Sequence, residues 1–566
     1  MKLGVGLLSS ALLAGAVWSV AGQALAQAAP PPPSAIAPSR QELNPEARRG
    51  ARPQTRNTDL FTPPSSLPCP LATSTLKFKL QGVDIVGSSI DARDAKAAYA
   101  DLIGSEIPVA KICEIRDRLS LILFRNGRLA RVEVPEQTIA GGRLKLEVTE
   151  ARIVAVRVHG DVGPGQDKVE AYLERLRGMT PFDLDTAQRY LLLANDVPGV
   201  RVAAALRPSA EGRGAIDLDV QLSRVPMDEL AAVQNTGSDS LGPWSGLARV
   251  DLNSFTAFGE RTTLIAYHTL TDNEQWIAQL VEEGRFGSNG LLGRVSLAYG
   301  QSRPGGVLAP LQLEGKSFVG TAELRYPLIR LRRYNVNVAA GIDVIDQSTA
   351  FPGGDELAND KLRVLWTHVN GDFVRNLTAD LSASGNGVLE VRKGVSFLDA
   401  SHAGDPTLSR IQGQPDAWLL RFEGESHLTY RWLDLALRAQ AQYADRPLLA
   451  YEEQAVGDLT IGRGYEPAVL SGDRGAAAEI KAQVRPISVR RSVTLSPFVF
   501  FDASYTDNLD AGSQSRTLRS AGVGVDARLP YGIRTSLAWA DPFDKPFPTS
   551  PTKPSQRVLF QLVIAR

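Results

Sequence analysis

The sequence has few cysteines, no excess of charge of either sign, and no long apolar run beyond its N-terminus. Two cysteines among 566 residues cannot build a disulfide-dense scaffold or a zinc site with four thiolates. Basic and acidic side chains number 62 each, so the net charge does not point to nucleic acid as a partner. The only long uncharged apolar run lies at the extreme N-terminus, which argues against a helical membrane protein.

Side-chain patterns for catalysis or metal binding are also missing. The five histidines are scattered without the spacing of metal ligands, and no Gly-x-Ser-x-Gly elbow occurs. The run Gly315–Ser317 resembles the end of a phosphate-binding loop, but Pro310 stands where such a loop requires its first glycine. The run Gly522–Ala527 fits a dinucleotide fingerprint only formally, because no helix is expected after it. We therefore expect no catalytic residue, no metal and no cofactor.

The N-terminus has the features of a cleaved secretory signal, which we assign to residues 1–26. Lys2 supplies a positive charge, Leu3–Val17 is apolar, and Ala24–Ala26 offers the small residues that signal peptidase accepts. The alternative is a membrane anchor, which the short apolar run and the cleavage pattern disfavour. The mature chain is therefore expected outside the cytoplasm.

A proline-rich stretch follows and is predicted to be a linker over residues 27–75. Pro30–Pro33 are consecutive, and further prolines are spread among small and polar residues. Such a composition buries too little apolar surface to offset the entropy lost on ordering. Only Gln41–Arg49 favours a short helix, with Asn44-Pro45 resembling a helix start near its middle.

Two similar patterns of strands and helices come next. In residues 76–151, an alternating segment precedes two segments with helical periodicity, and two more alternating segments close the pattern. The same order returns in residues 152–225. Two small α+β domains of about 75 residues each account for this repetition better than one domain of twice that size.

From residue 226 to residue 566, segments of about ten residues alternate between an apolar and a polar face. One clear example sets Trp418, Leu420, Phe422 and Leu428 against Arg421, Glu423, Glu425 and His427. A strand with one apolar and one charged face is expected where lipid lies on one side and water on the other. A soluble β-sandwich also alternates, but the segment length, the aromatic residues at segment ends and the secretion signal favour a membrane barrel.

Lipid does not tolerate open sheet edges, so such a sheet must close on itself. At about 20 residues for a strand and its turn, this stretch predicts an antiparallel barrel of roughly sixteen strands. A barrel of this size encloses an aqueous lumen.

Several short motifs occur in the two small domains. Those of the first domain are Leu80–Gly82, Asn126–Leu129, Pro135-Glu136-Gln137 and Gly142–Val148, and those of the second are Pro181–Asp183 and Asn195–Val200. Together they resemble the POTRA domains of two-partner secretion transporters, the TpsB family. The resemblance implies a mixed fold, with two periplasmic α+β POTRA domains and a transmembrane β-barrel in the cell outer membrane. It further implies that the POTRA domains receive an unfolded exoprotein by strand addition, for which an exposed sheet edge is suited.

The run Ile461-Gly462-Arg463-Gly464-Tyr465 resembles the signature of the sixth extracellular loop in that family, although Gly462 stands beside the arginine. The resemblance implies that this loop folds back into the lumen and that its arginine pairs with an aspartate of the barrel wall. The resemblance implies that Asp502, within Phe500–Ser504, is the matching aspartate, and alternation supports this choice because Asp502 shares a face with Thr494 and Ser496. We hypothesise that Arg463 and Asp502 hold the loop in a transport-competent position. For Gly-Arg-Gly alone, the alternative is an ordinary exposed turn.

Cys69 precedes the first predicted strand, and Cys113 lies on the second predicted helix of the same domain. In an oxidising compartment we predict that they form a disulfide that closes a loop of about 45 residues. The alternative is two free buried thiols.

These observations favour an outer-membrane pore that moves one exoprotein from the periplasm to the cell surface without nucleotide hydrolysis. The expected partners are the exoprotein, outer-membrane lipid and the barrel-assembly machinery for insertion, with no nucleic acid.

The C-terminal strand ends in Ala565-Arg566, where the family commonly ends in an aromatic residue. One alternative is a barrel-assembly factor, which usually carries more POTRA domains, and a less favoured one is a secreted soluble β-rich adhesin. The short helix of the linker is a candidate plug for the pore.

Overall fold

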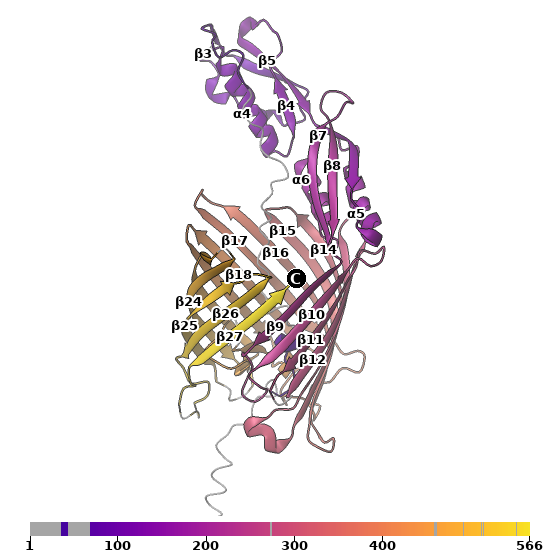
Figure 1. The fold of residues 1–566 in the computed structure, drawn as a ribbon, viewed down its shortest axis with the longest axis vertical. Helices are drawn as coiled ribbons and strands as arrows, with labels where there is room; N and C mark the ends of the chain where they lie inside the picture. The colour runs from indigo at the N-terminus through magenta and orange to yellow at the C-terminus, as the bar shows by residue number, and fades with distance from the viewer. Residues whose placement is uncertain are drawn as a thin grey trace, which may run out of the picture.

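The computed structural model describes residues 36–43, 68–271, 274–457, 461–490, 492–510, 512, 514–548, 550 and 552–566. The predicted signal peptide, residues 1–26, and most of the predicted linker lie outside the described residues. Two small α/β units stand at one end of a large closed β-barrel, with the second unit nearer to it (Figure 1). Of the helices in the described part of the chain, none combines the length and apolarity that a membrane span requires.

The first unit packs two helices against a three-stranded sheet of order β2-β5-β4. Helix α4 carries Ile112, Ile115, Leu119 and Leu123 on one face, and this face is buried against the sheet. In chain order, the unit contains β1 (Lys77–Lys79), β2 (Gly82–Val86), α3 (Ala92–Lys96), η2 (Ala100–Leu102), β3 (Glu106–Pro108), α4 (Lys111–Arg125), β4 (Ala130–Glu133), η3 (Ala140–Gly142) and β5 (Arg143–Glu150).

The alternating segment that opens this domain is divided into two strands, β1 and β2. Leu80 is fully buried, and its N–H donates to the Ser105 carbonyl oxygen at 3.1 Å, while the Gln81 N–H donates to Gly142 at 2.8 Å. The backbone therefore changes partners between the two strands: β1 pairs with β3, and β2 pairs in parallel with β5.

The second unit repeats the arrangement with a sheet of order β6-β8-β7. Asp183 caps helix α6 by accepting a hydrogen bond from the Thr186 N–H at 2.8 Å. The unit contains β6 (Arg152–His159), η4 (Gly163–Gly165), α5 (Gln166–Leu173), η5 (Glu174–Leu176), α6 (Leu184–Asn195), β7 (Val200–Pro208) and β8 (Ala215–Arg224).

The barrel is one antiparallel sheet that closes where β27 pairs with β9. It has sixteen strands in the described residues when β22 and β23, which both pair with β24, are taken as one interrupted strand. The strands are β9 (Met227–Gln234), β10 (Ser245–Asn253), β11 (Arg261–Thr269), β12 (Gln275–Phe286), β13 (Leu291–Ser302), β14 (Glu314–Arg330), β15 (Tyr334–Ala350), β16 (Glu356–Asn376), β17 (Leu381–Gly394), β18 (Trp418–Tyr430), β19 (Leu433–Ala444), β22 (Arg474–Val484), β23 (Ile487–Arg490), β24 (Val493–Asp507), β25 (Arg516–Arg528), β26 (Ile533–Pro542) and β27 (Arg557–Ala565). The short helix η6 (Gly306–Leu311) lies between β13 and β14. The predicted fold class, two α+β units followed by an antiparallel barrel of about sixteen strands, is confirmed, and the single closed sheet excludes a β-sandwich.

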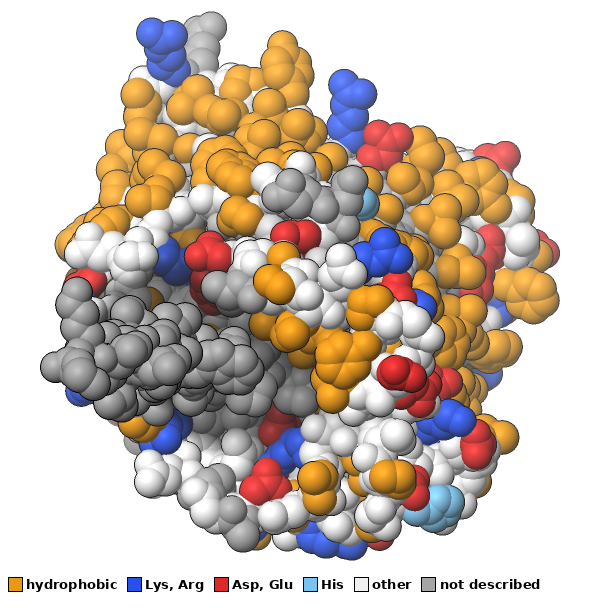
Figure 2. Space-filling view, turned by 90° about the horizontal axis from the view of Figure 1, so that it is seen from below, with side chains coloured by type: hydrophobic (Ala, Val, Ile, Leu, Met, Phe, Trp, Pro, Cys, Tyr) orange, Lys and Arg blue, Asp and Glu red, His pale blue; other side chains and the backbone are white. Residues whose placement is uncertain are grey.

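The two faces of the barrel strands differ as the alternation predicts. On β18, Leu420 and Phe422 are exposed on the outer surface, whereas Arg421 and Glu425 are buried inside. Figure 2 looks at the end of the barrel far from the α/β units and shows hydrophobic side chains over much of its outer rim, with charged side chains among the loops at the mouth. The apolar band faces lipid, and the charged face surrounds the lumen.

The second unit is attached to the near end of the barrel by polar contacts. Arg330 at the end of β14 pairs with Asp196 at 2.6 Å, and Arg189 of α6 donates to the Pro327 carbonyl oxygen at 2.9 Å. Ser254, after β10, donates to the Pro198 carbonyl oxygen at 2.7 Å. These contacts hold the second unit against the turns at this end of the barrel.

Candidate functional site in the barrel lumen

The connection between β19 and β22 folds into the lumen. We call its described residues, 445–457 and 461–473, the lumen loop. It contains η7 (Ala450–Glu452) and an antiparallel pair of short strands, β20 (Gln454–Val456) and β21 (Leu470–Gly472). Leu449 and Tyr451 are buried in a cluster with the inward-facing Ile345 and Leu362 of the wall. The loop therefore packs against the inner surface of the barrel, as the family resemblance implies.

Arg463 lies near the centre of the lumen loop, and its guanidinium faces the wall formed by β22 and β24. Its Nη2 atom is 2.7 Å from Glu479 Oε2, and its guanidinium carbon is 4.6 Å from the centre of the Phe500 ring. The Arg463 main-chain N–H donates to Asp502 Oδ2 at 3.3 Å, and Ser520 Oγ donates to the other oxygen of Asp502 at 2.7 Å. Charge pairing and ring stacking together fix one orientation of the guanidinium.

The structure therefore brings Arg463 and Asp502 together, but not by the predicted pairing of their side chains. Glu479 and Asp502 lie directly opposite each other on adjacent strands. The guanidinium pairs with Glu479, whereas the shorter Asp502 side chain accepts hydrogen bonds from the loop backbone and from Ser520. Alternation places Glu479 on an inward face, but nothing in the sequence links that face to Arg463.

The neighbours of Arg463 fit the loop tip to the wall. Gly462 has a φ of +85°, which favours glycine, and a Cβ on Gly464 would lie 2.7 Å from the Ser520 Cβ. The Tyr465 side chain is 1% exposed, and its hydroxyl donates to the Arg519 carbonyl oxygen at 2.9 Å and accepts from the Asp544 N–H at 3.0 Å. Gly464 and Tyr465 thus lie against the wall beside Arg463.

The opposite wall holds the first arm of the lumen loop with arginines. Glu452 of the loop pairs with Arg392 of β17 at 2.7 Å and with Arg421 of β18 at 3.2 Å. Arg392 also pairs with Asp343 of β15 at 2.7 Å, and every side chain in this set is at most 12% exposed. Sequence reasoning did not single out these residues, although the alternation of β18 placed Arg421 on the inward face.

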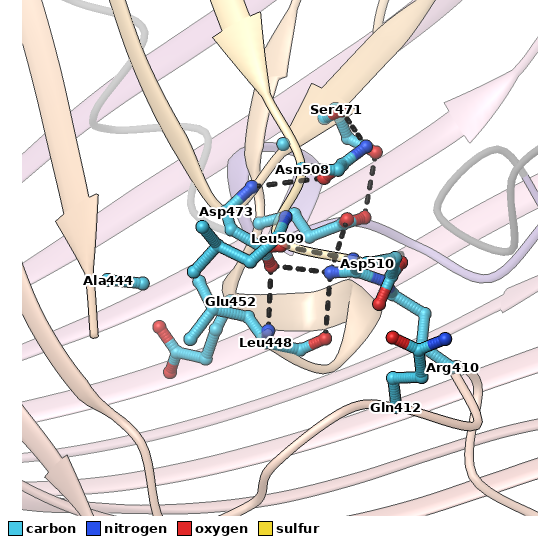
Figure 3. Close-up of polar contacts among 12 residues, drawn as sticks. Arg410, Gln412, Ala444, Leu448, Glu452, Ser471, Asp473, Asn508, Leu509 and Asp510 are labelled. Atoms are coloured by element: carbon cyan, nitrogen blue, oxygen red, sulfur yellow. Dashed lines mark hydrogen bonds and ion pairs between the residues drawn. The ribbon is translucent and has the colours of Figure 1, made fainter. Parts of the chain in front are cut away.

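At the mouth far from the two α/β units, Arg410 joins the base of the lumen loop to two neighbouring loops (Figure 3). Arg410 belongs to the β17–β18 connection and pairs with Asp473 at 2.5 Å, with Glu453 at 2.8 Å and with Asp510 of the β24–β25 connection. Asp473 also accepts hydrogen bonds from the main-chain N–H groups of Leu448 and Leu509, each at 2.7 Å. One guanidinium thus connects loops that extend from both walls.

A second piece of chain also lies in the lumen: residues 36–43, which we call the lumen segment. Gln347 and Ser317 both donate to the Pro38 carbonyl oxygen, at 3.1 and 3.0 Å. The segment ends in α2 (Arg40–Leu43), and Leu43 is 2% exposed among wall residues that include Tyr267 and Ile277. The helix expected over Gln41–Arg49 thus begins one residue early, and the part after Leu43 lies outside the described residues.

The remaining predicted site residues lie in the first α/β unit. Cys69 and Cys113 form a disulfide with their Cα atoms 5.7 Å apart, which ties the segment before β1 to helix α4. Gln137 exchanges two hydrogen bonds with the backbone of Lys145, at 2.8 and 2.7 Å, so its side chain extends the pairing of β5 beyond β4. Pro135 accepts a hydrogen bond from Gln137 at 3.3 Å, and Glu136 is exposed.

The fold and the filled lumen define an outer-membrane β-barrel transporter with periplasmic POTRA domains. A family model described as haemolysin secretion/activation protein ShlB/FhaC/HecB matches residues 212–529, and a model described as POTRA domain, ShlB-type, matches residues 78–151. The chain therefore belongs to the ShlB/FhaC/HecB family of two-partner secretion transporters.

Solved structures support the same fold. CdiB from Escherichia coli is similar with a TM-score of 0.69 and 15% identity, over 100% of both chains. CdiB from Acinetobacter baumannii is similar with a TM-score of 0.63 and 15% identity, also over 100% of both chains. A comparison with curated protein sequences finds no match.

Proposed function

We propose that this protein moves one exoprotein of the TpsA type from the periplasm to the cell surface. The observation that carries this proposal is a sixteen-stranded barrel whose lumen is filled by two segments of its own chain, the lumen loop and the lumen segment. Hydrogen bonds, ion pairs and noncovalent packing hold both segments. A filling of this kind can be displaced for an extended polypeptide while the barrel wall stays closed.

The POTRA domains supply edges on which an unfolded chain can pair. Strand β7 is nine residues long and lies at the edge of the sheet β6-β8-β7, bonded to β8 on one side only. Strand β4 is the corresponding edge of the first domain. An extended peptide that adds to such an edge gains main-chain hydrogen bonds without a fixed sequence, which suits a carrier of unfolded polypeptide.

Transport then requires that the exoprotein replace part of the chain that occupies the lumen. The lumen segment lies on the path of the exoprotein and must leave, whereas Arg463 and its wall partners keep the lumen loop in a transport-competent position. We further infer that the barrel-assembly machinery inserts the barrel into outer-membrane lipid, with β27 completing the closure.

The test is to delete the gene and compare the secreted proteins and the outer-membrane proteins with those of the parent strain. Loss of one large exoprotein from the medium, with other barrels unchanged, is the expected result. A general loss of outer-membrane barrels would instead indicate a barrel-assembly factor and contradict the proposal.

A further inference from the structure

A polar cavity of about 750 Å³ lies between the second POTRA domain and the periplasmic mouth of the barrel. Its domain side is formed by the end of α6, the start of β7 and Tyr172 of α5, and its barrel side by inward-facing residues of β11, β12, β14, β15 and β16. Its volume is comparable to that of ligand pockets, which measure about 300–1,000 Å³. A polypeptide that passes from this domain into the lumen crosses this region (Figure 1).

Two hydrogen-bond donors at this cavity, the Tyr172 hydroxyl and the Arg285 guanidinium, have few acceptors among the described residues. The Tyr172 side chain is 0% exposed, and its hydroxyl has no hydrogen-bond partner among the described residues. Arg285 of β12 donates to the Gly259 carbonyl oxygen at 3.4 Å, and in the described part of the chain no carboxylate forms an ion pair with it.

The two carboxylates that attract Arg285 electrostatically, Glu283 and Asp196, already have other partners. Asp196 receives two hydrogen bonds from Arg330, at 2.7 and 2.6 Å, and Glu283 faces Arg261 at 3.5 Å. A half-buried guanidinium whose neighbouring carboxylates are engaged elsewhere, and a buried hydroxyl without an acceptor, both lower the stability of a fold. Groups of this kind are retained in native proteins when a ligand uses them.

The two donors also share one electrostatic environment. Burial raises the pKa of the Tyr172 hydroxyl, and the positive charge of Arg285 opposes that rise. A group that accepts hydrogen bonds from both must be anionic to balance the guanidinium and planar to match its fork, and a carboxylate meets both conditions.

We propose that Arg285 and Tyr172 bind carboxylate side chains of the exoprotein as it passes from the second POTRA domain into the barrel. The inference rests on the proposed export function and adds a chemical preference to it. Acidic residues of the unfolded exoprotein pause at this cavity, and neutral or basic stretches pass without this contact.

The first experiment measures peptide binding by fluorescence anisotropy on the full-length protein in detergent micelles. The probes are labelled peptides that repeat Ser-Glu, Ser-Gln or Ser-Lys at equal length. We expect the acidic peptide to bind most tightly, and Arg285→Gln to weaken it by about tenfold or more, because a charged hydrogen bond is lost.

Arg201→Gln is the matched control, since Arg201 lines the same cavity from an exposed position. It removes the same charge from an exposed position, whereas Arg285 is half-buried, so we expect less than about a threefold change. Equal losses for the two variants, or equal binding of the acidic and basic peptides by the wild type, would overturn the assignment.

Tyr172→Phe gives a second and independent readout. Without the unpartnered hydroxyl, the thermal midpoint of unfolding should stay equal or rise, while the acidic peptide binds about threefold or more weakly. A lower midpoint would show that the hydroxyl bonds within the fold, and wild-type peptide binding would show that it does not contact the ligand; either result rejects its role.

Export in cells separates this inference from the proposed function. If deletion of the gene leaves every exoprotein secreted, the export function fails. If export is confirmed but Arg285→Gln and Tyr172→Phe bind the acidic peptide like the wild type, only the carboxylate site is rejected.

Discussion

The two walls of the lumen hold the same loop with opposite charges. On the β17–β18 wall, Arg392 and Arg421 of the barrel bind Glu452 of the loop, whereas on the β22–β24 wall, Glu479 of the barrel binds Arg463 of the loop. Because the loop offers a carboxylate to one wall and a guanidinium to the other, it has only one favourable orientation in the lumen. The side chains therefore specify the orientation of the loop as well as its attachment.

The walls also differ in the number of buried carboxylates that lose a cation when the arginine at the contact is removed. Arg392 faces Glu452, Asp343 and Glu390, so its removal leaves several buried carboxylates near one another. On the other wall, Arg463 is the loop's cation between Glu479 and Asp502, and aromatic rings share in its binding. We therefore expect the arginine-bearing wall to be the more sensitive of the two.

The largest effect is expected for the double substitution Arg392→Gln and Arg421→Gln. A buried ion pair that loses one partner costs about 3–5 kcal/mol, and here Glu452 loses both cations. The first arm of the loop should leave the wall, and the mean single-channel conductance in planar bilayers should rise. The control is Arg294→Gln, since Arg294 is an inward arginine that faces Glu323 at 3.9 Å. Equal conductance of the double variant and the control would contradict the role of Arg392 and Arg421 in holding the loop.

Arg463→Ala comes second, because it removes one buried pair, about 3–5 kcal/mol, together with the contact to Phe500. We expect the barrel to assemble, as judged by heat-modifiable migration in gels, but to secrete its exoprotein more slowly. Arg463→Lys keeps the charge but loses the planar fork, so its secretion rate should lie between those of the wild type and Arg463→Ala. Secretion at the wild-type rate by an assembled Arg463→Ala protein would refute the role of Arg463.

Arg410→Gln tests whether the walls act together, since Arg410 links loops that extend from both of them. Asp510 is partly open to water, with side-chain exposure at 30%, whereas Glu453 and Asp473 are buried. Because Asp473 keeps its hydrogen bonds from the Leu448 and Leu509 N–H groups, we expect a smaller loss of about 2–3 kcal/mol. The lumen loop should become more accessible to added protease on intact cells. Unchanged cleavage would mean that each wall holds the loop without this link.

The smallest effect is a difference between two substitutions on one wall. Glu479→Gln removes the charge that pairs with the Arg463 guanidinium, whereas Asp502→Asn weakens hydrogen bonds from a main-chain N–H and from Ser520. The secretion rate should fall further for Glu479→Gln than for Asp502→Asn. The difference between the two rates should correspond to about 1–2 kcal/mol. A larger fall in secretion for Asp502→Asn would instead support the pairing of Arg463 with Asp502 that the sequence predicts.

Much of the barrel was predictable because a strand has a period of two. The alternation of Leu420, Arg421 and Phe422 fixes which side chain faces lipid, and the same rule places Glu479 and Asp502 inside. The two POTRA units were predictable from helical spacing such as that of Ile112, Ile115 and Leu119.

The contacts of the site were not predictable in the same way. Arg410 belongs to a connection without periodicity, and its carboxylate partners Asp473 and Asp510 come from loops 63 and 100 residues away in the chain. Tyr172 has the spacing of an ordinary core residue, and only its unpartnered hydroxyl beside Arg285 distinguishes it. Neither feature leaves a local pattern in the sequence.

The order and period of its segments made the class of this protein predictable: two α+β domains followed by a closed β-barrel with an apolar outer face. Those properties follow from local periodicity and from the cost of placing polar groups in lipid, both of which act along a single strand or helix. The pairing of Arg463 with Glu479, the binding of Glu452 by Arg392 and Arg421, and the lack of an ion pair to Arg285 among the described residues became visible only in the folded chain. Partners of this kind depend on strand register and loop path, which bring together residues that no local pattern connects.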